Sequence, residues 1–193
     1  MSSPLGPISP GTVAVGSLTQ ARAHKRRYAA VVSIQDPVCG RNHALKIVRL
    51  PGVRSPAHLT LCFEDVDSEE WGLRVATERQ IREGLAFARE YAACSLLIHC
   101  ARGIGRSPAL ALGVLAERLG PGKEAEAVKS IFSTRPESCP NLVVVQKVDS
   151  VLNRAGALVC ALEKWESSRP EFAAWRKQRR EHVAKFTSAY TKA

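Results

Sequence analysis

A near-continuous apolar run, CSLLIH at residues 94–99, constrains the fold more than any other feature of this sequence. Apolar residues without polar alternation are typical of a strand that is covered on both faces, as in a parallel sheet. A glycine-bearing loop follows at once, and residues 108–119 then predict a helix with proline in its first turn and Gly120 just beyond its end. The order strand, loop and helix predicts an α/β fold with a loop held at a helix N-terminus.

The flanking segments divide into a strand-bearing first half and a helical second half. Thr77-Glu78-Arg79-Gln80 has the pattern of a capping box and predicts a helix start. We therefore expect an α/β fold with a central mixed, mostly parallel sheet of four to five strands flanked by helices, and a helical C-terminal half. Strands are predicted at 12–18, 28–34, 44–50 and 58–63, and further helices at 19–27, 123–132, 142–165 (with interruptions) and 171–190.

Length and charge frame the domain organisation. The 193 residues fit one domain of ordinary size, and 45% hydrophobic and 24% charged residues are typical of a globular chain that folds without disulfides or a structural metal. We expect a flexible leader over 1–10, a globular domain over 11–163 and a basic C-terminal helix or tail over 164–193. This last segment holds eight basic and three acidic residues, half of the net charge of +10. Such a run of charge usually belongs to a solvated basic helix, and weak contact with nucleic acid is the alternative interpretation.

Cysteine usage and hydropathy indicate the compartment. The six cysteines form no CxxC pair, and none has a histidine at zinc-like spacing apart from the adjacent His99 and Cys100. The chain has no apolar run near the length of a membrane span, and its first residues lack the pattern of a signal peptide. We expect reduced thiols in a cytoplasm, no membrane span, and no metal or cofactor.

The loop after the apolar run carries the chemistry. It reads HCARGIGRS over residues 99–107. Where a loop enters a helix, several backbone N–H groups and the helix dipole converge on one point, and Gly103 and Gly105 allow a tight cradle of amides. Arg106 adds a planar fork that can hold two oxygens of a phosphate at once. These features predict a receptor for a tetrahedral anion.

A thiol, that of Cys100, stands in this cradle. A free thiol has a pKa of about 8.5, so it is mostly protonated at neutral pH. Converging amides and a guanidinium favour the thiolate, which is the nucleophilic form. A charged sulfur beside a phosphate receptor suits phosphoryl transfer to sulfur, with the transferred oxygens held by the amides and Arg106.

The string resembles the His-Cys-x5-Arg-Ser/Thr motif of the protein tyrosine phosphatase superfamily. The chain is similar in size to the compact dual-specificity branch, and details outside the motif resemble its bacterial members. The resemblance extends less sharply over residues 12–158, and the basic C-terminal segment matches nothing in the family. It implies a metal-independent hydrolase that acts on phosphotyrosine and on phosphoserine or phosphothreonine.

By this resemblance, Cys100 is the nucleophile and forms a cysteinyl-phosphate, and Arg106 binds phosphate and stabilises the transition state. Ser107 donates a hydrogen bond to the thiolate and aids its departure. His99 lies behind the loop and fixes its shape. The phosphate-binding residues implied are Ala101, Arg102, Gly103, Ile104, Gly105 and Arg106.

The leaving group needs a proton from a general acid. In the family this is an aspartate on a loop before the cysteine, and Phe63-Glu64-Asp65-Val66 resembles the F-x-D-I/V pattern of bacterial members. We expect Asp65 to be this acid, with Asp67 as the alternative and Glu64 or Glu69 less favoured.

Three other positions stay open. Asn141, in a segment with Arg135 that resembles the part of bacterial members beside the phosphate loop, either braces that loop or caps the following helix. Asp36 is interpreted as part of a turn at a strand end. Arg102 either faces the pocket mouth and favours polyanionic substrates, points to solvent, or pairs with an acid.

The sequence is therefore consistent with two classes of function. The first is an enzyme for phosphorylated proteins, with a phosphoinositide or an RNA 5′-phosphate as alternative substrates of the same chemistry. The second is a catalytically weak module that binds phosphate groups through the same cradle. The intact Cys100, Arg106 and Ser107 favour the enzyme.

Overall fold

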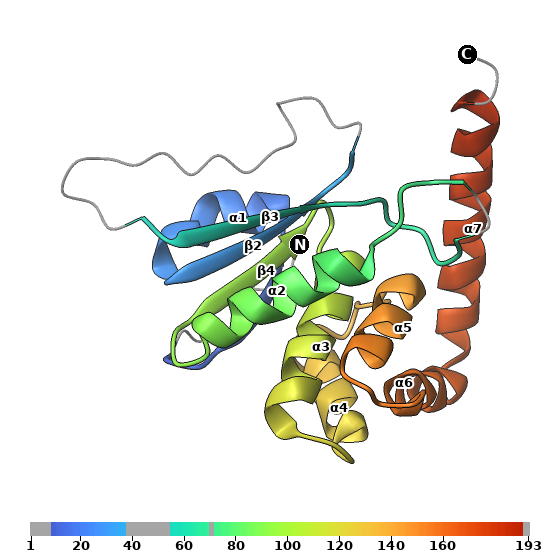
Figure 1. The fold of residues 1–193 in the computed structure, drawn as a ribbon. Helices are drawn as coiled ribbons and strands as arrows, with labels where there is room; N and C mark the ends of the chain where they lie inside the picture. The colour runs from blue at the N-terminus through green and yellow to red at the C-terminus, as the bar shows by residue number, and fades with distance from the viewer. Residues whose placement is uncertain (1–8, 38–54, 70–71, 191–193) are drawn as a thin grey trace.

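A sheet of four parallel strands organises the computed structural model, which describes residues 9–37, 55–69 and 72–190 (Figure 1). The strand order is β1-β4-β2-β3, and every pairing in the described residues is parallel, which confirms the α/β prediction. The predicted strand at 44–50 lies outside the described residues. The strands are β1 (Val13–Ser17), β2 (Ala30–Gln35), β3 (Ala57–Cys62) and β4 (Leu96–Cys100).

Strand β4 is central, and all five of its residues are buried, as the apolar run predicts. Alternate residues of the strands point to opposite faces. Ile98 faces the main core, which also contains apolar residues of the helices on that face, whereas Leu97 faces a smaller core against α1 (Leu18–His24). Figure 1 shows α1 on one side of the sheet and helices α2 to α6 on the other.

The helices follow the predicted order, and each predicted start lies within two residues of an observed one. The capping box forms at Thr77, whose side chain accepts from the backbone of Gln80. The helix after the loop at residues 101–105 begins at Arg106 rather than at the predicted Pro108. The backbone N–H groups of a helix's first turn have no acceptor within the helix, so proline is tolerated at any position of that turn. After α1 come the 3-10 turn η1 (Lys25–Arg27) and α2 (Glu78–Glu90), α3 (Arg106–Leu119), α4 (Glu124–Thr134), α5 (Leu142–Val151), α6 (Ala157–Ser167) and α7 (Pro170–Tyr190).

The long helix α7 runs along the side of α5 and α6 (Figure 1). Phe172 is buried in the main core, and its ring meets Phe132 edge-on at 5.5 Å between centroids. Phe132 also stacks on Trp165 of α6. The basic C-terminal segment is therefore attached to the domain through an aromatic cluster. Its predicted start at residue 164 lies inside α6.

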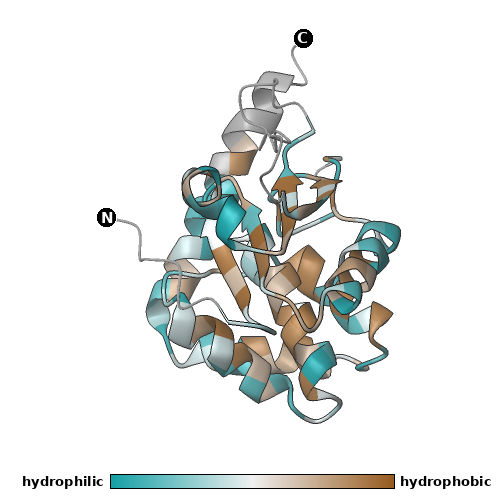
Figure 2. Ribbon diagram, turned by 90° about the vertical axis from the view of Figure 1, so that its left-hand side faces the viewer, coloured by the Kyte–Doolittle hydropathy of each residue, from teal (hydrophilic) through white to brown (hydrophobic). Residues whose placement is uncertain are grey.

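Hydrophobic residues lie mainly along the strands and on the helices beside them (Figure 2). No helix in the described part of the chain is long and apolar enough to cross a membrane.

Candidate active site

The carboxyl ends of the four parallel strands meet at one edge of the sheet, where ligands of open α/β sheets bind. Cys100 is the last residue of β4, and Asp36 follows β2 directly. The acidic loop that carries Asp65 and Asp67 leaves the end of β3. The topology thus brings the nucleophile candidate and the acid candidates to the same edge.

Four of the five carbonyls in the loop from Ala101 to Gly105 accept hydrogen bonds from segments outside the loop. In a trans peptide the N–H of the next residue points away from the carbonyl, and the described residues contain no cis peptide. The N–H groups that follow these carbonyls therefore face the concave side of the loop, as an anion receptor requires. The Ala101 carbonyl accepts from the Leu18 N–H (3.2 Å), and the Gly103 carbonyl accepts from Arg135 Nε (2.7 Å). The Ile104 carbonyl accepts from the Cys139 N–H (2.8 Å), and the Gly105 carbonyl accepts from the Asn141 N–H (3.1 Å).

The sulfur of Cys100 receives two hydrogen bonds inside this loop. The Gly103 N–H donates to Sγ at 3.2 Å, and the Ser107 hydroxyl donates at 3.3 Å. Cys100 is only 1% exposed, and the N-terminus of α3 begins six residues later at Arg106. Two donors thus hold the sulfur in place beside the N-terminus of α3, where backbone N–H groups and the helix dipole favour an incoming anion.

Both loop glycines are required by their surroundings. Gly103 has φ +73°, and a Cβ there would lie 2.6 Å from the backbone of Gly16 in β1. A Cβ at Gly105 would lie 2.5 Å from both carboxylate oxygens of Asp65. The absence of a side chain at Gly105 therefore lets the carboxylate of Asp65 approach the loop directly.

Arg106 is buried and surrounded by acceptors. Its Nη1 donates to the carbonyl of Phe63 and lies 2.7 Å from Asp36 Oδ1, and its Nε lies 3.8 Å from Asp65 Oδ2. Burial lowers the pKa of Arg106, but Asp65, Cys100 and Asp36 together raise it further, so the net shift is upward. Among the described residues, its Nε atom has no hydrogen-bond partner, so the guanidinium retains a donor for an incoming oxygen.

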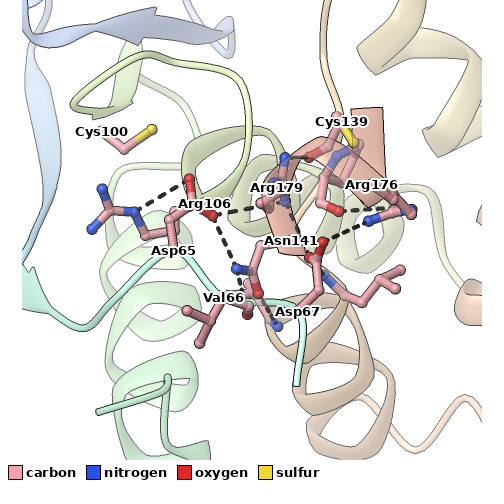
Figure 3. Close-up of polar contacts among 12 residues, drawn as sticks. Asp65, Val66, Asp67, Cys100, Arg106, Cys139, Asn141, Arg176 and Arg179 are labelled. Carbon is pink, nitrogen blue, oxygen red and sulfur yellow. Dashed lines mark hydrogen bonds and ion pairs between the residues drawn. The ribbon is translucent and has the colours of Figure 1, made fainter. Parts of the chain in front are cut away.

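The two candidate acids differ in environment (Figure 3). The Asp65 side chain is 30% exposed, accepts a hydrogen bond from Asn141 Nδ2 at 3.0 Å, and lies between Arg106 and Arg179. The Asp67 side chain is 8% exposed, and it accepts from the Leu142 N–H and pairs with two arginines of α7. Asp65 faces the phosphate loop, whereas Asp67 anchors its own loop to α5 and α7.

No family model matches this chain, and no curated protein matches it either. Solved structures do match it. A variant of human DUSP28 is 20% identical and has a TM-score of 0.55, over 81% of this chain and 99% of that one. PTPMT1 in complex with PI(5)P is 17% identical with a TM-score of 0.55, over 79% and 99%. The Yvh1 phosphatase domain from Chaetomium thermophilum is 18% identical with a TM-score of 0.51, over 80% and 98%.

The fold is that of the dual-specificity and protein tyrosine phosphatases. This confirms the fold that the motif at residues 99–107 implies. The expected kinship with bacterial members stays a prediction. The roles assigned to individual residues likewise stay predictions, for which the geometry supplies the argument.

In this phosphatase fold, the segment from Arg135 to Asn141, which follows α4, donates hydrogen bonds to carbonyls of the phosphate loop. Arg135 is buried, and besides the Gly103 carbonyl it donates to the carbonyl of Val15 and to Gln20. Asn141 both caps α5, by accepting from the Val144 N–H, and donates to Asp65 and to the carbonyl of Val66. The Asn141 side chain thus caps α5 and contacts the acidic loop, while its backbone N–H donates to the Gly105 carbonyl of the phosphate loop.

Behind the loop, His99 belongs to a chain of polar groups on the α1 face of the sheet. Its Nε2 lies 2.7 Å from the hydroxyl of Ser33, which also lies 2.7 Å from His58 Nε2. Burial lowers the pKa of His99 to about 4, so its ring is neutral at physiological pH. The residue lies behind the nucleophile, as the resemblance implies, and reaches β2 and β3 through this chain.

Two features of the site were not predicted from the sequence. Asp36 was interpreted as part of a turn, but it pairs with Arg106; its position directly after a strand at the same sheet edge was the available signal. The contribution of α7 was also missed, because charge alone does not distinguish an internal arginine from a solvated one.

Proposed function

We propose that this chain is a cysteine-dependent phosphomonoester hydrolase whose main substrates are phosphotyrosine and phosphoserine or phosphothreonine in proteins. The observation that carries the proposal is the pair of hydrogen bonds to the Cys100 sulfur, from Gly103 N–H and Ser107 Oγ, inside a loop in which four carbonyls accept hydrogen bonds from the surrounding segments. A structural cysteine has no need of such donors. A nucleophile facing a phosphate receptor does.

The reaction has two steps in this arrangement. In the first, the Cys100 sulfur attacks phosphorus and the ester P–O bond breaks, while Asp65 gives its proton to the departing oxygen and Arg106 holds the equatorial oxygens. In the second, water attacks the cysteinyl-phosphate and gives a proton to the Asp65 carboxylate. The S–P bond breaks, inorganic phosphate leaves, and the hydrogen bond from Ser107 stabilises the released thiolate. The chemistry requires a reduced thiol, so the proposal includes a cytoplasmic location.

The test is hydrolysis of p-nitrophenyl phosphate in the presence of a chelator. Cys100→Ser is expected to abolish turnover, because the hydroxyl is a far weaker nucleophile at neutral pH. Cys160→Ser is the matched control, since Cys160 is exposed on α6 and outside the site, and it should retain full activity. Binding of a phosphopeptide without turnover by the wild type would favour the phosphate-binding module instead.

A phosphoinositide is the second candidate substrate, favoured by Arg102. This side chain is exposed and makes no polar contact with the described residues, and it lines a cavity of about 330 Å³ with Ile104 and residues of α7. A free cation beside the phosphate loop suits a substrate with a second phosphate. A panel of phosphopeptides, phosphoinositides and 5′-phosphorylated RNA would distinguish the candidates, and Arg102→Gln should lower kcat/KM selectively for a polyanionic substrate.

A further inference from the structure

Two arginines of helix α7, Arg176 and Arg179, point toward Asp67 of the acidic loop (Figure 3). Arg176 donates to Asp67, to the carbonyl of Pro140 and to Glu166 of α6. Arg179 donates to Asp67 Oδ1 at 3.1 Å and to the carbonyl of Cys139 at 2.7 Å. The acidic loop is therefore tied to α7 and, through the same guanidinium groups, to the segment that supports the phosphate loop.

Arg179 also reaches the acid itself. Its Nη1 lies 3.9 Å from Asp65 Oδ1, while Arg106 Nε lies 3.8 Å from Asp65 Oδ2 on the other side. The carboxylate is thus held between the phosphate-binding arginine and an arginine of the C-terminal helix. Asn141 completes the arrangement with its hydrogen bond to the same Oδ1.

Burial strengthens the electrostatic interaction in these ion pairs. The side chains of Arg176 and Arg179 are 12% and 15% exposed, so water screens their charges far less than those of a surface pair. Burial lowers the pKa of Arg179, but Asp65 and Asp67 raise it further, and the guanidinium stays charged. A buried cation that faces two carboxylates of one loop restricts where that loop can lie.

We propose that Arg179 is a positioning residue for the general acid: through Asp67 and the Cys139 carbonyl it fixes the acidic loop, and at Asp65 it sets the place from which the proton is delivered. This inference rests on the proposed function. It assigns the C-terminal helix a part in catalysis, in place of the solvated basic tail that its composition predicts. Misplacing a catalytic group by about 1 Å can cost roughly a hundredfold in rate.

Leaving-group dependence provides the test, because a poor leaving group needs the proton and a good one does not. Arg179→Gln is compared with wild type on phenyl phosphate, whose phenol has a pKa of about 10 like tyrosine, and on p-nitrophenyl phosphate. We expect kcat/KM to fall roughly tenfold to a hundredfold for phenyl phosphate and at most about threefold for p-nitrophenyl phosphate. Lys177→Gln removes a charge from the exposed side of the same helix and should change neither value.

A double-mutant cycle with Asp65→Asn shows whether Arg179 acts through the acid. We expect Arg179→Gln to cost nothing further in the Asp65→Asn background, since the group that it positions is then gone. Equal losses on both substrates, or an undiminished loss in that background, would overturn the inference. Should Arg179→Gln fold poorly in a thermal melt, Arg179→Lys replaces it; lysine keeps the charge but not the two-pronged contact, and should show the same pattern to a smaller degree.

The outcomes separate this inference from the proposed function. Inactive wild-type enzyme, or an active Cys100→Ser variant, contradicts the proposed function itself. If the wild type is active but the losses caused by Arg179→Gln and Asp65→Asn add in the double mutant, only the role of Arg179 is contradicted.

Discussion

The shape of the phosphate loop at residues 101–105 depends on two glycines that have no side chain. Gly103 combines a positive φ with contact to the backbone of β1, and Gly105 leaves the space that the Asp65 carboxylate fills. The two positions explain why the loop reads GIG rather than any other small-residue pattern. They also make the loop sensitive to the smallest substitution.

Gly103→Ala is expected to destabilise the protein by about 2–4 kcal/mol and to abolish activity, because left-handed strain of about 1 kcal/mol adds to a backbone clash. Gly122→Ala is the matched control: its φ of +81° is similar, but nothing lies within 4 Å of the added Cβ. It should cost only about 1 kcal/mol and leave turnover intact. Urea unfolding and p-nitrophenyl phosphate hydrolysis measure both, and similar losses for the two variants would contradict the close approach to β1.

His99 makes stability depend on pH. Its pKa is about 4 in the folded chain and about 6.5 when unfolded, so between these values the unfolded state binds more protons. Stability contributed by neutral His99 is complete above pH 6.5 and is lost as the pH falls towards 4, by up to about 3 kcal/mol. Urea unfolding at pH 7, 5.5 and 4.5 should show this slope in wild type and a shallower one in His99→Gln. Parallel slopes would argue against a buried neutral imidazole.

At the scale of secondary-structure elements, local signals were predictable and long-range pairings were not. The apolar run at 94–99, the capping box at Thr77 and the loop-to-helix transition each depend on neighbouring residues, and all are confirmed. The pairing of Asp36 with Arg106, and of Arg179 with the acidic loop, joins segments far apart in the chain. Such contacts follow from strand order and helix docking, which periodicity does not encode.

Phe172 supplies a buried aromatic contact between α7 and the main core. This ring is 3% exposed and contacts Phe132 and Trp175, so Phe172→Ala should cost about 3 kcal/mol. The loss should also release the arginines of α7 from the acidic loop and lower activity on phenyl phosphate. Chemical denaturation together with that assay tests the prediction, with Lys177→Ala as a surface control. A cost below about 0.5 kcal/mol, typical of surface sites, would mean that α7 is not docked.

For the whole molecule, the positive charge is divided between internal and external uses. Arg106, Arg135, Arg176 and Arg179 are held by carboxylates and carbonyls around the site, whereas Arg102 is exposed beside it. Composition alone predicted attraction of anions and weak contact of the C-terminal segment with nucleic acid. The nucleic-acid contact stays a prediction, and two of the arginines on which it depended are engaged in internal ion pairs.

The most direct measurement is rapid quenching of turnover in acid, followed by mass spectrometry of the peptide that contains Cys100. The account predicts phosphate on the Cys100 sulfur during turnover of p-nitrophenyl phosphate, lost on a chase at the rate of hydrolysis and absent from Cys100→Ser. Turnover by the wild type with that sulfur never phosphorylated, under conditions where hydrolysis of the intermediate limits the rate, would contradict it.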